Sequence, residues 1–183
     1  MRPVETVITY LQQFRPSSFK PPIWPTDVQV VRHEFPSPEQ YRHLYGEVGR
    51  DYRWTDRSLL SDQQLMDIFA TPGFELWVLE VAGIPAGYVE LVFGETDCSP
   101  MSWPPEECCK VAYFGLFPEF LGRGLGQKLL LFGLEQAWNR PSCQRVWLHT
   151  CNHDHVAALP NYLKAGFAPF GQEVYLNEKL REA

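Results

Sequence analysis

Three glycines at two-residue spacing are the residues of this chain that most clearly suggest chemistry. They are Gly122, Gly124 and Gly126, and they follow the apolar run Val111–Phe117. An amphipathic pattern of helical type begins directly after them at Gln127. A strand, a glycine-rich turn and the start of a helix expose backbone N–H groups beside the positive end of a helix dipole. The sequence therefore predicts an anion site here, suited to a phosphate or pyrophosphate group.

Other nucleotide-binding patterns fit this turn less well. A dinucleotide-binding loop is followed by an acidic residue about 20 residues later, and that distance here brings Arg140–Gln144, which contains none. A Walker loop ends in Lys followed by Ser or Thr, whereas this chain has Gln127 and Lys128. An ordinary tight turn is the structural alternative, because glycine is the usual residue wherever the backbone turns sharply.

Two motifs in matching order carry a resemblance to a known family. The run from Leu121 to Gly126 resembles the acetyl-CoA loop of the GNAT N-acetyltransferase superfamily, which reads Arg or Gln, any two residues, Gly, any residue, and Gly or Ala. Gly124 and Gly126 fit this pattern, whereas Leu121 stands where Arg or Gln is usual. The later run Tyr162–Phe167 is similar to the Tyr-x-Lys-x-Gly-Phe that ends the last helix of the family. The resemblance covers residues 28–177.

The resemblance implies an α/β fold class with a GNAT-type mixed, mostly antiparallel, central sheet flanked by helices. It also implies acetyl-CoA as the acetyl donor, held where the strands Val111–Phe117 and Arg145–Thr150 splay apart. The backbone near Leu116 would polarise the thioester carbonyl, and the helix N-terminus would hold the pyrophosphate. The implied cofactor-binding residues are Leu116, Phe117, Gly122, Arg123, Gly124, Leu125, Gly126 and Gln127, together with Asn152 or His155 from a later turn.

Tyr162 is the candidate acid in the reaction that the resemblance implies. In that reaction a primary amine attacks the thioester directly, and the thiolate that leaves must gain a proton. A phenol with a pKa of about 10 is protonated at neutral pH and can donate to a thiolate whose conjugate acid has a pKa of about 8.5. The alternative is that Tyr162 is a half-buried helix aromatic without a catalytic role.

The base that takes the proton from the amine is harder to place. Many members of the superfamily carry Glu eight residues before the Pro that follows the cofactor strand, and this chain has Lys110 there. Glu90, on the expected polar face of the neighbouring strand beside Tyr88, is the best substitute. The alternatives are that Glu90 is an ordinary solvated charge, or that a relay of water molecules replaces a dedicated base.

The segment Asp51–Arg57 alternates charged and aromatic side chains and joins the first two expected helices. The corresponding region of the superfamily shapes the acceptor site. Asp51 or Asp56 can hold an amine by charge and Trp54 by a cation–π contact, so we assign these three as substrate residues. The alternative is a solvated loop that Trp54 anchors.

The histidines and cysteines do not form a recognisable metal motif. His149, His153 and His155 lie close together in the sequence, but their spacing matches no helical two-histidine motif. The five cysteines are odd in number and lack zinc-knuckle spacing, and adjacent cysteines such as Cys108 and Cys109 rarely meet disulfide geometry. The sequence predicts reduced thiols and no metal site.

Composition limits the compartment and the partners. With 183 residues, 45% of them apolar, the chain can bury a full core. A net charge of −6 argues against a nucleic-acid partner and weakly favours a cationic amine or peptide acceptor. No apolar run approaches the roughly 20 residues that span a bilayer, and Met1–Gln12 lacks the features of a signal peptide. We therefore expect a cytoplasmic protein without a membrane partner.

Periodicity, caps and turns indicate the elements that must position these residues. We expect residues 1–27 to form a strand at Val4–Leu11 and a proline-rich arm, and residues 28–183 to form a single acetyltransferase domain. The first strand would pair with the sheet edge or with a second protomer, which makes a homodimer possible. Pro160 predicts a kink or a late start in the last helix. The other expected elements are strand Val28–Phe35, helices from Pro38 to Val48 and Asp62 to Ala70, strands Glu75–Val81, Ala86–Phe93 and Val111–Phe117, helix Gln127–Asn139, strand Arg145–Thr150, helix Asp154–Ala165 and strand Glu173–Asn177, with Cys98–Lys110 as a loop.

Together these features predict an acetyl-CoA-dependent N-acetyltransferase that moves an acetyl group to a primary amine in a ternary complex. Two alternatives remain open. Leu121 and Lys110 depart from the family pattern and suit a catalytically silent acyl-CoA-binding or sensory module. Protein lysines or N-termini are an alternative class of acceptor.

Overall fold

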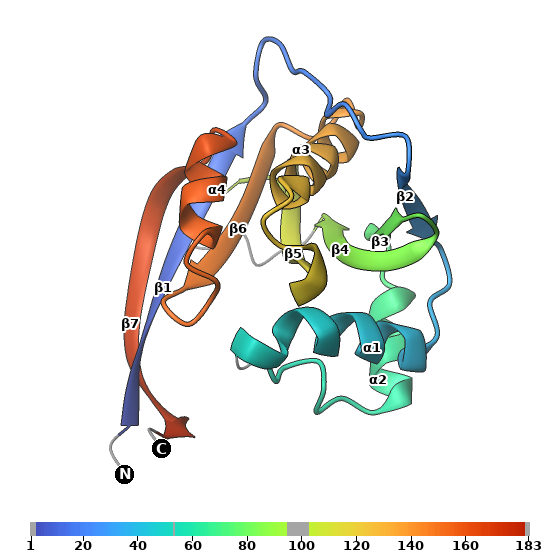
Figure 1. The fold of residues 1–183 in the computed structure, drawn as a ribbon. Coiled ribbons are helices and arrows are strands. Elements are labelled where there is room, and N and C mark those ends of the chain that lie inside the picture. Colours follow the sequence, from blue (N-terminus) through green and yellow to red (C-terminus); the bar gives the residue numbers. More distant parts are fainter. Residues whose placement is uncertain (1–2, 53, 95–102, 182–183) are drawn as a thin grey trace.

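The computed structural model describes residues 3–52, 54–94 and 103–181. None of the helices in this part of the chain is long and apolar enough to cross a membrane. Short 3-10 turns lie at Arg50–Tyr52, Pro105–Glu107 and Pro118–Phe120. In chain order, the main elements (Figure 1) are β1 Pro3–Phe14, β2 Val28–His33, α1 Pro38–Gly49, α2 Asp62–Phe69, β3 Phe74–Val81, β4 Ile84–Phe93, β5 Cys108–Leu116, α3 Leu125–Trp138, β6 Arg145–Cys151, α4 Ala158–Lys164 and β7 Ala168–Arg181.

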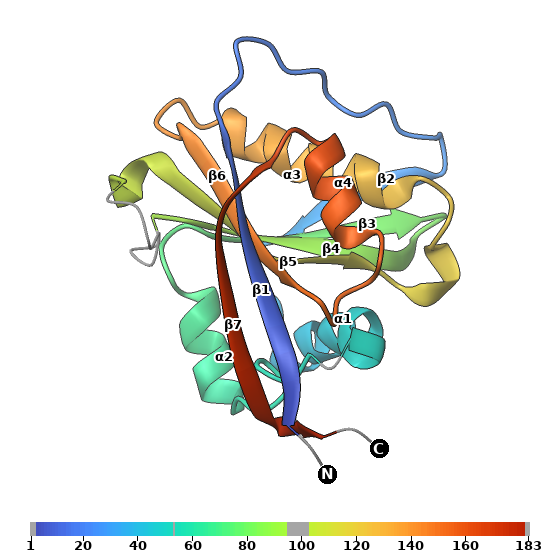
Figure 2. The same cartoon turned by 90° about the vertical axis from the view of Figure 1, so that its left-hand side faces the viewer.

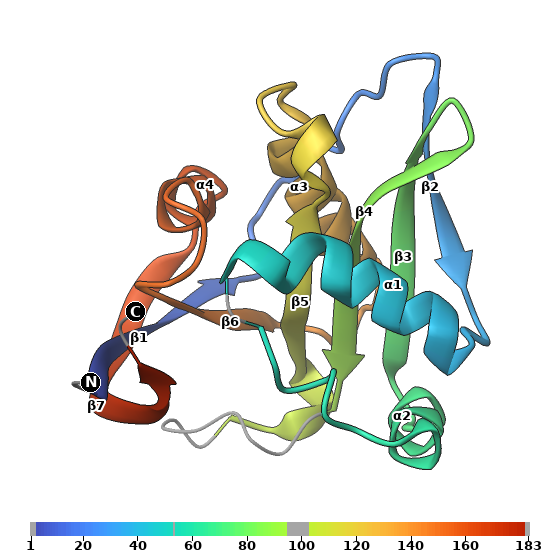
Figure 3. The same ribbon diagram turned by 60° about the horizontal axis from the view of Figure 1, so that its bottom comes forward.

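The strands of the described residues form one seven-stranded sheet in the order β2-β3-β4-β5-β6-β1-β7. Neighbouring strands are antiparallel except β5 and β6, which run parallel. Helices pack on both faces of this sheet, as Figure 3 shows most clearly. The mixed, mostly antiparallel α/β fold predicted from the sequence is therefore confirmed.

Each face of the sheet carries its own hydrophobic core. α3 and α4 pack on one face, where Leu11, Leu129 and Leu148 are at most 1% exposed. α1 and α2 pack on the other face, over β3, β4 and β5, where Tyr41 and Leu65 are fully buried. The parallel strands β5 and β6 lie between these helices, so residues from both faces of the sheet can reach the space between the two strands.

Serine caps begin the first two helices, which start at the residues expected from the sequence, Pro38 and Asp62. Ser37 Oγ accepts a hydrogen bond from the Gln40 amide at 3.2 Å, and the Ser37 amide donates to Gln40 Oε1 at 3.2 Å. Ser61 and Gln64 form the same reciprocal pair at the start of α2. These capping boxes satisfy amides that have no partner inside the helix, so they fix where α1 and α2 start.

The last helix starts late, as Pro160 predicts. α4 begins at Ala158, so Pro160 lies in its first turn, where its missing N–H breaks no helical hydrogen bond. Gly166 follows the helix with a φ of +97°, and the amide of Phe167 donates back to the Tyr162 carbonyl at 3.1 Å. This glycine-terminated ending fixes the C-terminal end of α4, the helix that carries the candidate acid.

Strand β1 lies inside the sheet, which corrects the expectation that it pairs with the sheet edge or with a second protomer (Figure 2). It pairs with β6 along one side, with Leu11 opposite Leu148, and with β7 along the other, with Val7 opposite Val174. Leu11 is fully buried in the core under α3 and α4. The side chains of β1 thus contribute to the sheet and to its core within one chain.

The proline-rich segment after β1 contains no helix or strand, as predicted, and crosses over α3 (Figure 2). The Lys128 ammonium of α3 donates a hydrogen bond to the Ile23 carbonyl oxygen. The Trp24 ring packs against that of Phe132, with 6.4 Å between the centroids. These contacts fasten the connection between β1 and β2 to the outer side of α3.

Part of the segment expected to be a loop is strand. β5 starts at Cys108, three residues before the predicted start at Val111. Cys108 and Cys109 are at most 1% exposed, because these small thiols pack like apolar side chains. Residues 95–102 of the expected loop, including Cys98, lie outside the described residues. The extra strand residues matter because they are the ones that pair β5 with β6.

Candidate active site

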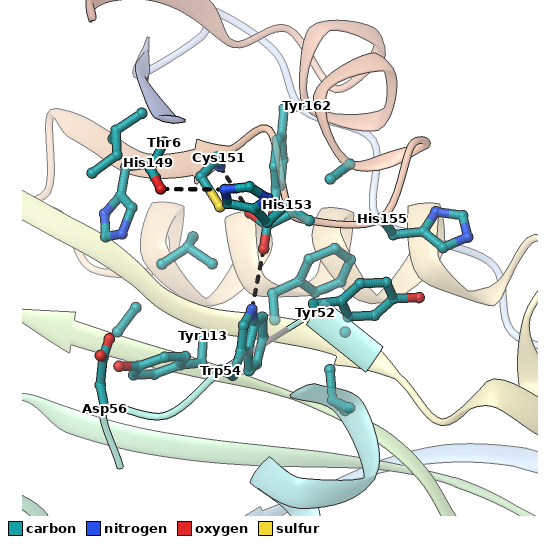
Figure 4. A pocket seen from close by; sticks show the side chains of 18 of the residues that line it. Thr6, Tyr52, Trp54, Asp56, Tyr113, His149, Cys151, His153, His155 and Tyr162 are labelled. Carbon is teal, nitrogen blue, oxygen red and sulfur yellow. Dashed lines mark hydrogen bonds between the residues drawn. The ribbon is translucent and has the colours of Figure 1, made fainter. Parts of the chain in front are cut away.

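β5 and β6 separate after a short paired stretch, and a pocket opens between them (Figure 4). Pairing is restricted to Cys108–Lys110 of β5 and Arg145–Trp147 of β6. Both strands continue beyond these residues, β5 to Leu116 and β6 to Cys151. The gap leads into a pocket of about 940 Å³ lined by β5, β6, β1, β7, α4 and the loop after α1. The splayed strands expected from the sequence are therefore present.

A bulge in β5 faces this pocket. In the pairing with β4, Glu90 lies opposite Tyr113 and Leu91 lies opposite Val111, so Ala112 is an extra residue without an opposite partner. Such a bulge interrupts the hydrogen-bond ladder and re-aims backbone groups. Ala112 lines the pocket, where its backbone N–H is a candidate donor to a carbonyl oxygen. The resemblance implies a donor further along β5, near Leu116, and no side chain in the sequence signals the bulge at Ala112.

The glycine turn ends at a helix N-terminus that no side chain of the described residues caps. Gly124 is the N-cap of α3 and has a φ of +71°, a left-handed conformation that glycine adopts without strain. A Cβ added at Gly122 or Gly124 would meet no atom within 4 Å, so open space lies beside the turn. Leu121 and Gly126 line the pocket. The first amides of α3 are thus placed to bind an anion at one end of the pocket.

The other residues predicted to hold the cofactor divide between the pocket and the core. Leu116 lines the pocket, whereas Phe117 is 6% exposed and its amide bonds to β4. Arg123 is exposed at the turn, and Leu125 is buried. The side-chain oxygen of Gln127 is buried without a hydrogen-bond partner among the described residues. Buried polar atoms of this kind usually have a partner, so a bound molecule could supply one.

Tyr162 reaches the pocket from α4 (Figure 4). Its side chain is 7% exposed, and its ring centroid lies 6.1 Å from that of Phe114. Burial raises the pKa of the Tyr162 phenol above its usual value, and the nearby Asp154 carboxylate raises it further. A phenol with a raised pKa keeps its proton over a wider pH range, so Tyr162 is suited to donate a proton.

Trp54 and Asp154 connect the two walls of the pocket. The indole N–H of Trp54 donates to Asp154 Oδ1 at 3.1 Å, while Oδ2 accepts from the Thr150 hydroxyl at 2.7 Å and the Cys151 amide at 2.9 Å. Trp54 comes from the loop after α1, and Asp154 from the turn after β6. The sequence indicates Trp54 but gives no signal for Asp154, because an aspartate in a turn has many ordinary roles.

The residues predicted to bind the acceptor are only partly brought together. Trp54 and Asp56 line the pocket, whereas Asp51 is exposed in a 3-10 turn and does not line it. The Trp54 ring packs against Tyr113 of β5, with 5.4 Å between the centroids. Tyr113 also lines the pocket, and the sequence analysis did not single it out. Arg53 of the same segment lies outside the described residues.

Glu90 is buried beneath the pocket, which corrects the expectation of an exposed polar strand face. Its side chain is 0% exposed, accepts a hydrogen bond from the Tyr41 hydroxyl at 2.5 Å and pairs with the Arg57 guanidinium at 2.9 Å. Burial raises the pKa of Glu90, and the Arg57 charge and the Tyr41 hydrogen bond oppose the rise. Because α1 covers this face of β4, Glu90 does not line the pocket.

The turn after β6 carries the two cofactor candidates Asn152 and His155. Asn152 joins the turn to β1, because its side chain accepts from the Val7 amide at 2.9 Å and donates to the Glu5 carbonyl at 3.1 Å. His155 lines the pocket, with its ring 5.9 Å from that of Tyr52. Across residues 3–52, 54–94 and 103–181, no group of three or more His, Cys, Asp or Glu side chains is placed to hold a metal ion.

Sequence comparison gives a match that covers most of the fold. Residues 36–167 match the family model described as the acetyltransferase (GNAT) family. The matched part runs from the start of α1 to the end of α4 and contains both splayed strands, the glycine turn and Tyr162. A comparison with curated proteins gave no match.

Several solved structures share the fold at low sequence identity. A GCN5-related N-acetyltransferase from Kribbella flavida is 18% identical with a TM-score of 0.59, covering 95% of this chain and 56% of that one. An aminoglycoside acetyltransferase from an uncultured soil metagenomic sample is 13% identical with a TM-score of 0.62, and the match covers 85% of this chain and 97% of that one. The aminoglycoside N-acetyltransferase AAC(6')-Iy in complex with CoA is 12% identical with a TM-score of 0.62, and the match covers 84% of this chain and 95% of that one. This chain thus spans little more than half the length of the Kribbella protein.

Proposed function

This chain belongs to the acetyltransferase (GNAT) family, and on that premise we propose that it moves the acetyl group of acetyl-CoA to a primary amine by direct attack in a ternary complex. One observation carries the proposal, namely that three features meet in a single pocket. These are the gap between β5 and β6, the uncapped N-terminus of α3 and the buried phenol of Tyr162. This combination suits an elongated donor, because the helix N-terminus can bind its anionic end, the gap can hold its chain, and the phenol lies where a thioester would react.

The residues at the glycine turn suit the phosphate end of acetyl-CoA. The first amides of α3 and the open space beside Gly122 and Gly124 favour a pyrophosphate, and the exposed Arg123 adds a positive charge. The Gln127 side chain, whose oxygen has no partner among the described residues, can bond to an amide of the donor. Leu116, Gly126 and His155 are the other lining residues that we assign to the donor.

The groups further along β5 suit the chemistry of amide formation. Acetyl-CoA supplies the thioester whose carbonyl carbon the amine attacks. The bulge at Ala112 can donate its backbone N–H to the carbonyl oxygen, where negative charge develops. Tyr162 holds a proton that the departing thiolate needs, and its raised pKa keeps that proton in place until it is used.

We propose a small cationic amine as the acceptor. Trp54, Tyr113 and Asp56 line the pocket, so aromatic faces and a carboxylate are available to an ammonium group. Asp51, an exposed residue of the same segment, adds negative charge to the surface. Two of the structurally similar proteins are aminoglycoside acetyltransferases, which makes aminoglycosides one acceptor class to test on this chain. Peptides that present a lysine or an N-terminus form the second class.

Thiol release from acetyl-CoA tests the proposed function. The purified chain is assayed with small amines, amino acids, polyamines, aminoglycosides and lysine-containing peptides, and mass spectrometry checks the product for an added acetyl group. We expect acceptor-dependent release of CoA and an acetylated amine. Acetyl-CoA binding by calorimetry without release for any acceptor would favour a silent acyl-CoA-binding module. Absence of binding would reject both functions.

A further inference from the structure

His149 lies on the pocket wall opposite the β5 bulge. Trp147 is the last residue of β6 that pairs with β5, and it does so opposite Lys110. Because the two strands run parallel, His149 and Ala112 each come two residues later, on the two sides where the gap opens. The His149 side chain is exposed and lines the pocket. An imidazole therefore faces the region in which the backbone N–H of the bulge would hold a carbonyl.

Figure 4 places His149 at the acceptor end of the pocket. In that view its imidazole lies on the same side of Trp54 as Tyr113 and Asp56, whereas His155 lies on the other side. All five of these residues line the same pocket. The donor-binding turn is reached along β5 in the opposite direction, through Leu116. The imidazole is thus near the place where an amine would approach the thioester.

The carboxylates that could act as base are engaged elsewhere. Glu90 is fully buried and bonded to Arg57 and Tyr41, outside the pocket. Asp154 uses both oxygens to accept hydrogen bonds, including that of Trp54. Aspartate has an ordinary pKa of about 4 and histidine one of about 6.5, so an imidazole is the stronger base near neutral pH. Asp56 is better suited to attract the ammonium group than to deprotonate it.

Titratable and charged groups surround His149 on several elements. The Tyr10 ring of β1 lies 5.9 Å from the imidazole, and Tyr10 in turn contacts Glu173 of β7. The Lys110 ammonium lies 4.8 Å from the centroid of the Trp147 ring. Among the described residues, the titratable and charged groups on the surrounding elements are Tyr10, Glu173, Tyr175, Lys110, Tyr113, Asp56, Cys151, His153 and Asp154.

We propose that His149 is the general base of the transfer, an inference that rests on the proposed acetyltransferase function. The neutral imidazole takes one proton from the substrate ammonium, and the resulting amine attacks the thioester carbonyl carbon. The C–N bond forms, the C–S bond breaks, and Tyr162 gives its proton to the departing thiolate. The second proton of the nitrogen returns to the Tyr162 oxygen, and His149 releases its proton to solvent. The balance is ammonium plus thioester to amide, thiol and one proton.

The pH dependence of kcat/KM tests this role. With the best acceptor from the thiol-release panel, kcat/KM of the wild type should rise with pH along a limb that reports loss of the imidazole proton in the free enzyme. His149→Gln should lack that limb and lose about 10²-fold or more in kcat/KM, with unchanged acetyl-CoA affinity by calorimetry. His33→Gln is the matched control, because His33 lies on β2 outside the pocket and should retain the wild-type profile.

Chemical rescue provides the second readout. Added imidazole should restore turnover to His149→Ala above the acceptor-free blank, and should not stimulate the wild type or His33→Ala. A His149→Gln enzyme that keeps the rising limb overturns the inference, and so does a loss of activity that accompanies lost acetyl-CoA binding without imidazole rescue. Failure of the proposed function is a separate result, because it appears in the wild type as absence of thiol release with any acceptor.

Discussion

At the scale of single residues, Asp154 links the two functional ends of the pocket. Its carboxylate accepts the indole N–H of Trp54 at 3.1 Å and also raises the pKa of Tyr162. The same side chain therefore fixes a residue of the acceptor loop and helps to keep the candidate acid protonated. Because Thr150 and the Cys151 amide bond to the second oxygen, Asp154 is held in one orientation. We therefore propose that Asp154 couples the position of Trp54 to the protonation of Tyr162.

Tyr162→Phe should lower kcat by about 10²-fold and change the KM for acetyl-CoA little, because only the transferable proton is lost. Since burial and Asp154 raise the pKa of Tyr162, the wild type should not lose turnover through deprotonation of this phenol as the pH rises to about 10. Steady-state thiol-release kinetics measure both. Tyr88→Phe, which removes a buried hydroxyl outside the pocket, is the control. Unchanged turnover in Tyr162→Phe would remove this residue from the mechanism.

Glu90→Gln should destabilise the fold by about 3 kcal/mol, because it leaves the Arg57 charge, whose side chain is 17% exposed, without its buried partner. Arg57 lies in the loop that carries Trp54 and Asp56, so the KM for the acceptor should rise as well. Urea denaturation and acceptor titrations measure these effects. Glu80→Gln, whose partner Gln29 is exposed, should change stability by less than about 0.5 kcal/mol. A fall in kcat of about 10²-fold at unchanged stability would instead support Glu90 as the base.

At the scale of elements, the site exists because two parallel strands stop pairing. The last residue of β5 that pairs with β6 is Lys110, and the bulge at Ala112 follows it closely. The end of the β5–β6 ladder therefore coincides with a distortion of the β4–β5 ladder. After β5 ends at Leu116, a 3-10 turn and the glycine turn lead to α3, which starts at Leu125. In the described part of the chain no side chain caps this N-terminus, and it faces the open space beside Gly124. One strand thus carries the candidate backbone donor near one end of the pocket and leads to the candidate anion site at the other.

Gly124→Glu should weaken acetyl-CoA binding by more than about 10-fold. The new carboxylate would lie at the positive end of the α3 dipole, where it would repel the phosphates of acetyl-CoA. The change also forces a non-glycine residue into a left-handed conformation, which costs about 1 kcal/mol. Gly83→Glu is the control with matched strain, because Gly83 has a φ of +78° and an added Cβ there would meet no described atom within 4 Å. Gly83 lies in the turn between β3 and β4, away from the pocket. Calorimetry should show weakened binding in the first variant alone. Equal affinity in both would refute the anion site.

Local signals made most elements predictable, and contacts distant in sequence account for what was missed. Ser37, Ser61 and Pro160 fix helix starts through neighbouring backbone groups, so the sequence alone indicates them. The bulge at Ala112 depends on the pairing of β4 with β5, and the burial of Glu90 depends on α1 lying over β4. Neither relation is visible in the residues themselves, so the bulge was not predicted and Glu90 was wrongly expected on an exposed polar face.

At the scale of the whole molecule, the N-terminal strand completes the sheet that holds the pocket. β1 separates β6 from β7, and its side chains Thr6 and Ile8 line the pocket. Asn152 in the turn after β6 bonds to the β1 backbone through both ends of its amide. We therefore propose that the acetyltransferase unit includes β1, rather than residues 28–183 alone.

Removal of residues 1–14 should prevent stable folding, because β6 and β7 would both lose their partner and Leu11 would leave the core. Circular dichroism and soluble yield measure the outcome. A variant with Ser17→Gly and Ser18→Gly, two exposed positions in the segment that crosses α3, is the control and should fold normally. A folded, acetyl-CoA-binding fragment of residues 15–183 would show that β1 is dispensable.

The most direct test of the central claim is a crystal structure of the chain grown with CoA. We expect density for the pyrophosphate at the amides of Gly122–Gln127, and for the pantetheine chain in the gap between β5 and β6, with the thiol near Tyr162. Density for CoA elsewhere on the molecule, or an empty gap in crystals grown at saturating CoA, would contradict it.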